Sequence, residues 1–129
     1  MRLLVDTHIF LWMAAAPERL GAALAAVERP ANDVLLSAAS SWELAIKVAL
    51  GRLELPEPVS SYVPSRMQAL AVDGLAVEHA HATAVEHLPP HHRDPFDRLL
   101  VAQARAVGAT LVTADRALEP YDVPILWAR

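Results

Sequence analysis

The sequence contains no cysteine, and this absence excludes disulfide bonds, thiolate zinc sites and thiol catalysis. It also contains a single lysine, Lys47, beside ten arginines, and it has no polybasic tail. Because the formal net charge is −4, the chain as a whole does not attract nucleic acid, and any such affinity must come from a local feature. A chain without cysteine suits a reducing compartment, so we expect a cytoplasmic protein.

Long apolar runs are also absent. The longest wholly apolar segment covers residues 9–16, which is shorter than the roughly 20 residues that a membrane-spanning helix needs. Asp6 and His8 interrupt the stretch that a signal peptide would use as its apolar region. We therefore expect neither a membrane span nor a targeting segment.

Apolar side chains are nevertheless abundant. Of the 129 residues, 54% are hydrophobic and 20% are charged, which is enough for one compact domain over residues 1–129 with a sizeable core. Short apolar runs without alternation predict buried strands, and segments typical of helices separate them. The expected strands cover residues 2–5, 34–37, 75–77, 110–113 and 124–127, and the expected helices cover residues 8–16, 18–28, 40–50, 60–70, 80–88 and 94–108.

Strands that alternate with helices require crossover connections. The pattern therefore predicts an α/β domain with a parallel sheet and helices on both of its faces. Parallel sheets of this kind bind ligands beyond the carboxyl ends of their strands.

Five acidic side chains fall at that edge of the predicted sheet. They are Asp6 at the end of the first strand, Glu43 in the helix after the second strand, Asp94 and Asp97 at the start of helix 94–108, and Asp115 just past strand 110–113. Their placement predicts a shared site, provided that the strands and helices pair as expected.

Most of these acids also have a structural interpretation. Ser40 with Glu43 fits a capping box, in which the glutamate reaches back to the amide at the start of the helix. Asp94 before Pro95 fits an N-cap, and Asp97 is favoured by the dipole of the same helix. Each pattern alone is more typical of a helix start than of a catalytic site.

Capping also accounts for two other positions, with Thr7 as the expected cap of the first helix and Asp115 as the cap of residues 116–118. Asp6 is harder to explain in this way, because a carboxylate that ends a buried strand is costly unless something pairs with it. The gathering of these acids at one edge of one sheet favours a common function over separate caps.

A cluster of carboxylates needs a source of positive charge. Two carboxylates about 4 Å apart repel by around 4 kcal/mol at an effective dielectric of about 20. Protons, nearby arginines (Arg93, Arg98 and Arg116) or a divalent cation must relieve this repulsion. Oxygen donors without cysteine favour Mg²⁺ or Mn²⁺ over zinc, and such an ion supports nuclease or phosphatase chemistry alike.

Two other enzyme or signalling classes on similar sheets are disfavoured. A haloacid-dehalogenase-like phosphatase needs an aspartate two residues after Asp6, where His8 stands. A response-regulator receiver needs an acidic pair after the first strand and a late lysine, whereas Lys47 is the only lysine. A non-catalytic module whose acids bind a basic partner peptide stays open as an alternative.

Four segments of the chain resemble the PIN-domain nucleases, and within them the VapC-like toxins of bacterial toxin–antitoxin pairs. They are residues 3–8 (LLVDTH), 40–47 (SSWELAIK), 92–98 (HRDPFDR) and 113–115 (TAD). Together with the closing residues 124–127, they extend the resemblance over essentially the whole chain, and four acidic motifs in this order are a specific signal.

The resemblance implies a three-layer sandwich around a parallel sheet of about five strands, and Mg²⁺-dependent endoribonuclease activity. The implied catalytic acids are Asp6, Glu43, Asp97 and Asp115, of which Asp6, Asp97 and Asp115 hold the metal ion, either Mg²⁺ or Mn²⁺. Thr7 and Thr113 would orient carboxylates through their hydroxyl groups. Asp94 matches the additional acid of this subgroup, which either contacts metal or caps its helix.

The same resemblance implies three partners, namely an RNA substrate, a small antitoxin protein and a second copy of the chain. The segment 9–16 agrees modestly with a protein partner, because a helix that is apolar on all sides is either buried or covered by another chain. Burial within the same chain is the interpretation that we favour for this helix.

Histidines, tryptophans and arginines complete the candidate residues. We expect His91 and His92 to lie in a solvated loop rather than to form a zinc site, and His79 and His81 to face water. Base stacking by tryptophan is possible in principle, but three isolated tryptophans in an apolar chain are more typical of a core. The tryptophans are Trp12, Trp42 and Trp127, and the candidates for phosphate contacts are Arg52, Arg93, Arg98 and Arg116.

Overall fold

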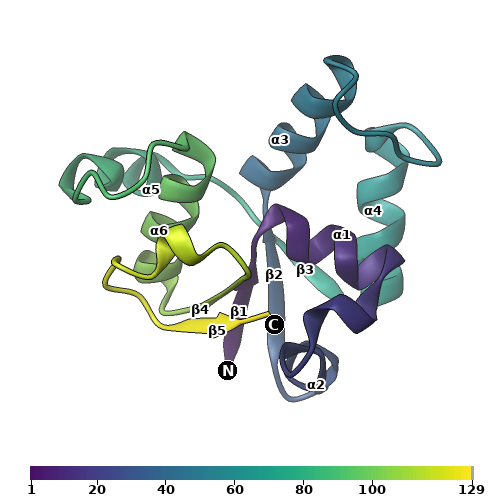
Figure 1. The fold of residues 1–129 in the computed structure, drawn as a ribbon, viewed down its shortest axis with the longest axis horizontal. Helices are drawn as coiled ribbons and strands as arrows, with labels where there is room; N and C mark the ends of the chain where they lie inside the picture. Colours follow the sequence, from purple (N-terminus) through teal and green to yellow (C-terminus); the bar gives the residue numbers. More distant parts are fainter. Residues whose placement is uncertain (129) are drawn as a thin grey trace.

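A five-stranded parallel sheet forms the centre of the computed structural model, which describes residues 1–128 (Figure 1). The strands are β1 (Arg2–Val5), β2 (Asp33–Ser37), β3 (Val72–Leu75), β4 (Thr110–Thr113) and β5 (Ile125–Trp127). Their order across the sheet is β3-β2-β1-β4-β5, and every neighbouring pair is parallel. The predicted α/β fold is therefore confirmed, with β1 as the central strand.

Helices cover both faces of this sheet, with α1 and α4 on one side and α5 and α6 on the other (Figure 1). The α-helices are α1 (Thr7–Ala15), α2 (Ala23–Glu28), α3 (Ala38–Ala49), α4 (Val59–Leu70), α5 (His79–Ala84) and α6 (Pro95–Val107). Short 3₁₀ segments are η1 (Pro17–Leu20), η2 (Val85–His87) and η3 (Arg116–Leu118). In the described part of the chain, no helix has the length and hydropathy of a membrane span.

Side chains of the central strand point alternately into two hydrophobic cores. Leu3 and Val5 pack with residues of α1, α3 and α4, whereas Leu4 packs with residues of α6. All three side chains are fully buried. A strand that is covered on both faces needs apolar residues at every position, which explains the unbroken apolar run in the sequence.

The third strand lies earlier than predicted. We expected a strand over residues 75–77 after a turn at Asp73-Gly74, but β3 spans Val72–Leu75 and includes both turn-forming residues. Its register pairs Val34 of β2 with Val72. Pairing with β2 therefore outweighs the local turn preference of an Asp-Gly sequence.

Two predicted helices are broken into shorter pieces. The segment 18–28 divides at Gly21, whose φ of 56° is a left-handed conformation that ends η1 before α2 begins. The segment 80–88 divides into α5 and η2. The first helix begins at Thr7, so that Asp6, rather than Thr7, is its N-cap.

Two predictions for single side chains are wrong. His81 does not face water but is only 6% exposed, and its Nδ1 accepts a hydrogen bond from the backbone amide of Glu78. Trp42 does not belong to the core but is 63% exposed on α3. Trp12 and Trp127 are half-buried.

Candidate active site

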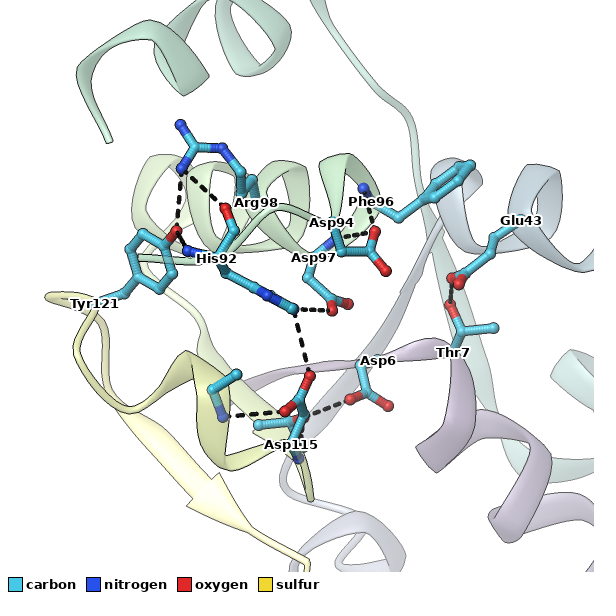
Figure 2. A network of polar contacts seen from close by, with 12 residues as sticks. Asp6, Thr7, Glu43, His92, Asp94, Phe96, Asp97, Arg98, Asp115 and Tyr121 are labelled. Carbon is cyan, nitrogen blue, oxygen red and sulfur yellow. Dashed lines mark hydrogen bonds and ion pairs between the residues drawn. The ribbon is translucent and has the colours of Figure 1, made fainter. Parts of the chain in front are cut away.

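The predicted acids converge on one cleft beyond the carboxyl ends of β1 and β4. The cleft has a volume of about 340 Å³. Figure 2 shows the carboxylates of Asp6, Asp97 and Asp115 gathered around a common space, with Glu43 nearby. The lining residues are Asp6, Thr7, His8, Trp12, Glu43, Lys47, His92, Asp94, Asp97, Ala114 and Asp115.

Asp6 lies at the end of the central strand and caps α1. One of its carboxylate oxygens accepts a hydrogen bond from the amide of Ile9 at 2.9 Å, and the other accepts one from the hydroxyl of Thr113 at 2.5 Å. Burial raises the pKa of Asp6 above its ordinary value, and these two hydrogen bonds offset part of the effect. The hydroxyl of Thr113 therefore contacts Asp6 directly, which agrees with its expected role of orienting a carboxylate.

Glu43 projects from α3 toward the same cleft. Thr7 Oγ1 donates a hydrogen bond to Glu43 Oε1 at 2.6 Å, and Lys47 Nζ lies 3.0 Å from Glu43 Oε2. The predicted capping box with Ser40 is wrong, because α3 begins at Ala38 and its N-cap is Ser37. Glu43 is thus free of the helix start and is held by a threonine and the only lysine.

Asp94 and Asp97 come from the first turn of α6. As predicted, Asp94 is the N-cap, and its Oδ1 accepts hydrogen bonds from the amides of Phe96 at 2.9 Å and of Asp97 at 3.4 Å. Burial raises the pKa of Asp97 to about 6, repulsion from Asp94 and Asp6 adds to the shift, and a contact with His92 opposes it.

His92 belongs to the site, although we expected it in a solvated loop. Its Nε2 lies 2.9 Å from Asp97 Oδ2 and 3.5 Å from Asp115 Oδ2 (Figure 2). Its backbone amide donates to the hydroxyl of Tyr121 at 3.0 Å, and Arg98 Nη1 donates to the same hydroxyl at 3.1 Å. The only sequence signal for this histidine was its position within the motif 92–98.

Asp115 is the most exposed of the four proposed catalytic acids. Its Oδ1 accepts a hydrogen bond from the amide of Ala117 at 3.0 Å, so the predicted cap of η3 is confirmed. Its own amide donates to the hydroxyl of Thr113 at 3.0 Å. Thr113 therefore joins Asp6 and Asp115 through one side chain.

Arginines do not neutralise the cluster. Arg98 donates to backbone carbonyls and to Tyr121, and the guanidinium of Arg116 lies over the ring of Trp127 at 4.1 Å. Among the described residues, no ion pair joins Arg93, Arg98 or Arg116 to an acid of the cleft. Within the described part of the chain, Lys47 is the only lysine or arginine paired with an acid of the cleft, which leaves an excess of carboxylates that a divalent cation would relieve.

The donor atoms have the spacing of a metal site. One ligand atom from each of His92, Asp97 and Asp115 lies within 4.8 Å of the others. Ligands of a divalent ion at about 2.0–2.6 Å are about 3–5 Å apart, so these residues fit such an ion. The expected donor set held oxygen atoms only, and the structure adds an imidazole, which suits Mn²⁺ or Zn²⁺ better than Mg²⁺, among the carboxylates.

Comparison with known proteins agrees with this architecture. Residues 3–124 match the PIN domain family. Ribonuclease VapC22 of Mycobacterium tuberculosis is 34% identical over 121 residues, which are 94% of this chain and 92% of that protein. Ribonuclease VapC16 of the same organism is 53% identical over 57 residues, but the match spans only 44% of this chain and 40% of that protein.

Solved structures share the fold. A chain of VapBC2 from Rickettsia felis, bound to a DNA fragment from its promoter, superposes with a TM-score of 0.76 at 15% identity and full coverage of both chains. A chain of FitAcB from Neisseria gonorrhoeae superposes with a TM-score of 0.65 at 23% identity and 96% coverage of both. The family match and the nearly full-length similarity to VapC22 show that this chain belongs to the PIN-domain family, among its VapC-like members.

Proposed function

We propose that the chain is a Mg²⁺-dependent endoribonuclease and the toxin of a toxin–antitoxin pair. The observation that carries this proposal is the convergence of Asp6, Asp97 and Asp115 on one cleft that no described arginine neutralises. The raised pKa values of Asp6 and Asp97 support it, because they reflect buried negative charge that a cation would stabilise.

Asp6, Asp97 and Asp115 would hold the divalent ion, and His92 is placed to add a nitrogen ligand. When bound, the ion supplies charge neutralisation, polarisation of the scissile phosphate and activation of water. We favour Mg²⁺ because carboxylates dominate the cleft, with Mn²⁺ as the alternative that tolerates the imidazole. The proposed products carry a 5′-phosphate and a 3′-hydroxyl group.

The chain's own residues orient the reacting groups. Thr7 and Lys47 fix the carboxylate of Glu43, which faces the cleft as a hydrogen-bond acceptor for the attacking water. Asp94 fixes the first turn of α6 and so sets the position of Asp97. In the same way, Thr113 sets the position of Asp6.

The proposed partners follow from the named relatives. Two similar proteins are called ribonuclease VapC, which supports RNA as the substrate. Structures of VapBC and FitAB type share the fold, which supports a small antitoxin protein as a partner. A homodimer, a cytoplasmic location and one nuclease domain over residues 1–129 complete the proposal.

Cleavage of single-stranded RNA tests the activity. We expect cleavage with Mg²⁺, none after addition of EDTA, and a loss of about 100-fold or more in Asp6→Asn and Asp97→Asn. Asp122→Asn is the matched control, because Asp122 is an exposed aspartate outside the cleft. Equal cleavage under all of these conditions would remove the proposed mechanism.

The alternative of a non-catalytic module predicts a different result. In that case no RNA is cleaved, and an arginine-rich peptide raises the melting temperature more than millimolar Mg²⁺ does. An antitoxin tail that fills the same acidic cleft would also raise the melting temperature. Cleavage activity, rather than peptide binding, therefore separates the two functions.

A further inference from the structure

Gln103 is the only polar residue among the largest fully buried side chains of the described chain, and the proposed mechanism does not use it. It lies on α6, whose other buried residues are apolar. Burying an amide costs free energy unless hydrogen bonds replace those that it makes with water. An apolar side chain would fill the same position without this cost, so packing alone does not explain the amide.

Both ends of the Gln103 amide have hydrogen-bond partners. Its Oε1 accepts a hydrogen bond from Ser37 Oγ at 2.6 Å, and Ser37 Oγ in turn accepts one from the backbone amide of Ala39 at 3.0 Å. Its Nε2 donates to the carbonyl of Ala76 at 3.3 Å and lies 3.4 Å from His81 Nδ1. A buried polar network in which each member has a partner fixes one arrangement of the elements that it joins. Gln103 thus connects α6 to the N-cap of α3, to the chain after β3 and to α5.

The contact between Gln103 and Ser37 fixes α3 against α6. Among the described residues, no other side-chain hydrogen bond and no ion pair joins α3 or its N-cap to α6. Further along α3, the ring of Trp42 packs against Phe96 at a centroid distance of 5.3 Å. Apolar contacts have no preferred direction and tolerate small shifts of one helix over the other, whereas a hydrogen bond requires two particular atoms to meet. The hydrogen bond therefore sets the register of the two helices.

These two helices carry two of the proposed catalytic acids, Glu43 on α3 and Asp97 on α6. Each acid lies six positions from the hydrogen bond, counted from Ser37 forward to Glu43 and from Gln103 back to Asp97. At a rise of about 1.5 Å per residue, this is about 9 Å along each helix axis. A slip or tilt of α3 at the hydrogen bond would therefore move one carboxylate relative to the other.

We propose that Gln103 is a positioning residue of the candidate active site. Through Ser37 it fixes the start of α3 against α6, and it thereby sets the placement of Glu43 relative to Asp97. The proposal rests on the nuclease function proposed above and adds to it a residue that does not line the cleft. It predicts a loss in the catalytic step rather than in metal binding, because α3 carries none of the residues that fit a divalent ion.

Steady-state cleavage of single-stranded RNA with Mg²⁺ tests this positioning role. Gln103→Met keeps the length of the side chain but removes the amide, and Ser37→Ala removes the hydroxyl that bonds to it. We expect each variant to lower kcat about 10- to 100-fold and to change KM less than about threefold. Affinity for Mn²⁺, measured by calorimetry, should stay close to the parent value, whereas loss of a group that supports metal ligands would cost about 10- to 100-fold.

Val27→Ala is the matched control for stability. Val27 is a buried core residue of α2, which Figure 1 shows at the opposite end of β2 from α3. This variant should also lose stability in urea unfolding, but its kcat should equal that of the parent protein. The double variant Ser37→Ala/Gln103→Met should lose no more of kcat than the single variant with the larger loss, because both changes remove the same hydrogen bond.

A distance measurement tests the same inference without catalysis. Since the chain contains no cysteine, Ala45→Cys on α3 and Arg105→Cys on α6 place spin labels at two exposed positions only. Electron–electron double resonance should give a broader distribution of distances between these labels in Gln103→Met than in the parent protein or in Val27→Ala. If Gln103→Met does not fold, Ser37→Ala provides the same comparison.

Equal kcat values and equal distance distributions in Gln103→Met and Val27→Ala would overturn the proposal and leave Gln103 with a role in stability alone. Losses of kcat that multiply in the double variant overturn it too, because Ser37 and Gln103 would then act independently. If the parent protein cuts no RNA, the nuclease function fails, and the distance distributions alone decide whether Gln103 positions α3.

Discussion

Thr113 donates a hydrogen bond to Asp6 although 107 positions separate the two residues in the sequence. The contact follows from the sheet, because β1 and β4 pair Val5 with Val112 and so place the next residues of both strands side by side. The hydroxyl supplies one of the hydrogen bonds that allow a carboxylate to lie almost fully buried at the end of the central strand.

The first prediction concerns this hydroxyl. Thr113→Val keeps the shape of the side chain but removes the hydrogen bond to Asp6, and we expect a loss of about 1–3 kcal/mol in the free energy of unfolding at pH 7. Thr110→Val is the matched control, because Thr110 lies on the same strand and its hydroxyl makes no hydrogen bond among the described residues. Equal stability losses in the two variants by urea unfolding would contradict the role given to Thr113.

The second prediction is that Asp97→Asn stabilises the metal-free protein. The pKa of Asp97 is about 6 in the folded chain, against an ordinary value of 3.8, so the fold favours the protonated form. The contribution of protonated Asp97 to the free energy of unfolding is present in full below pH 3.8 and is lost as the pH rises through about 6. At about 1.4 kcal/mol for each pKa unit, the ionised group costs up to about 3 kcal/mol at pH 7.

Asparagine carries no charge and avoids this cost. We expect Asp97→Asn to raise the free energy of unfolding by about 1–3 kcal/mol at pH 7 in EDTA, and to have little effect at pH 4. Unfolding by urea at both pH values is the measurement. A variant that is less stable than the parent protein at pH 7 would show that the contact between His92 and Asp97 outweighs the burial of charge.

The third prediction is that metal-dependent activity falls as the pH drops through about 6. A cation and a proton compete for the carboxylate of Asp97, whose pKa is raised to about 6 without metal. Raising the Mg²⁺ concentration should therefore move the midpoint of the acid limb to lower pH. Rate measurements between about pH 5 and pH 8 at two Mg²⁺ concentrations test this, and a midpoint that does not move with Mg²⁺ would contradict the competition.

Local sequence patterns predicted those parts of the fold and site that depend on neighbours in the chain. Asp94 before Pro95 predicted the start of α6, and Asp115 predicted the cap of η3. The five strands were also predictable as apolar runs, apart from the position of β3. In each of these cases the deciding interactions join residues a few positions apart, or they depend only on the burial of apolar side chains.

Contacts between distant segments were not predictable in this way. Glu43 matched a capping box by its spacing from Ser40, but its partner Thr7 lies 36 positions away. Trp42 had the composition expected of a core residue, and its exposure depends on where α6 packs. His92 entered the site because its loop is tied to Tyr121, 29 residues later, which no local pattern indicates.

The last prediction concerns Arg98, which holds that loop. Its guanidinium donates to the carbonyls of Pro89 at 2.9 Å and of Leu88 at 3.3 Å, and to the hydroxyl of Tyr121 at 3.1 Å. Lysine cannot reach several acceptors at once with a planar fork, so Arg98→Lys should lower the free energy of unfolding by about 1–3 kcal/mol.

The same substitution should also lower activity, because the loop that Arg98 fixes carries His92 next to Asp97. Arg105→Lys, at an exposed position of the same helix, should change neither stability nor activity. Tyr121→Phe separates the effect on stability from the effect on activity. It removes the hydrogen bond that the amide of His92 donates to the Tyr121 hydroxyl, while the contacts of Arg98 with the carbonyls stay in place. If Arg98→Lys and Arg105→Lys behave alike in urea unfolding and RNA cleavage, the loop does not depend on Arg98.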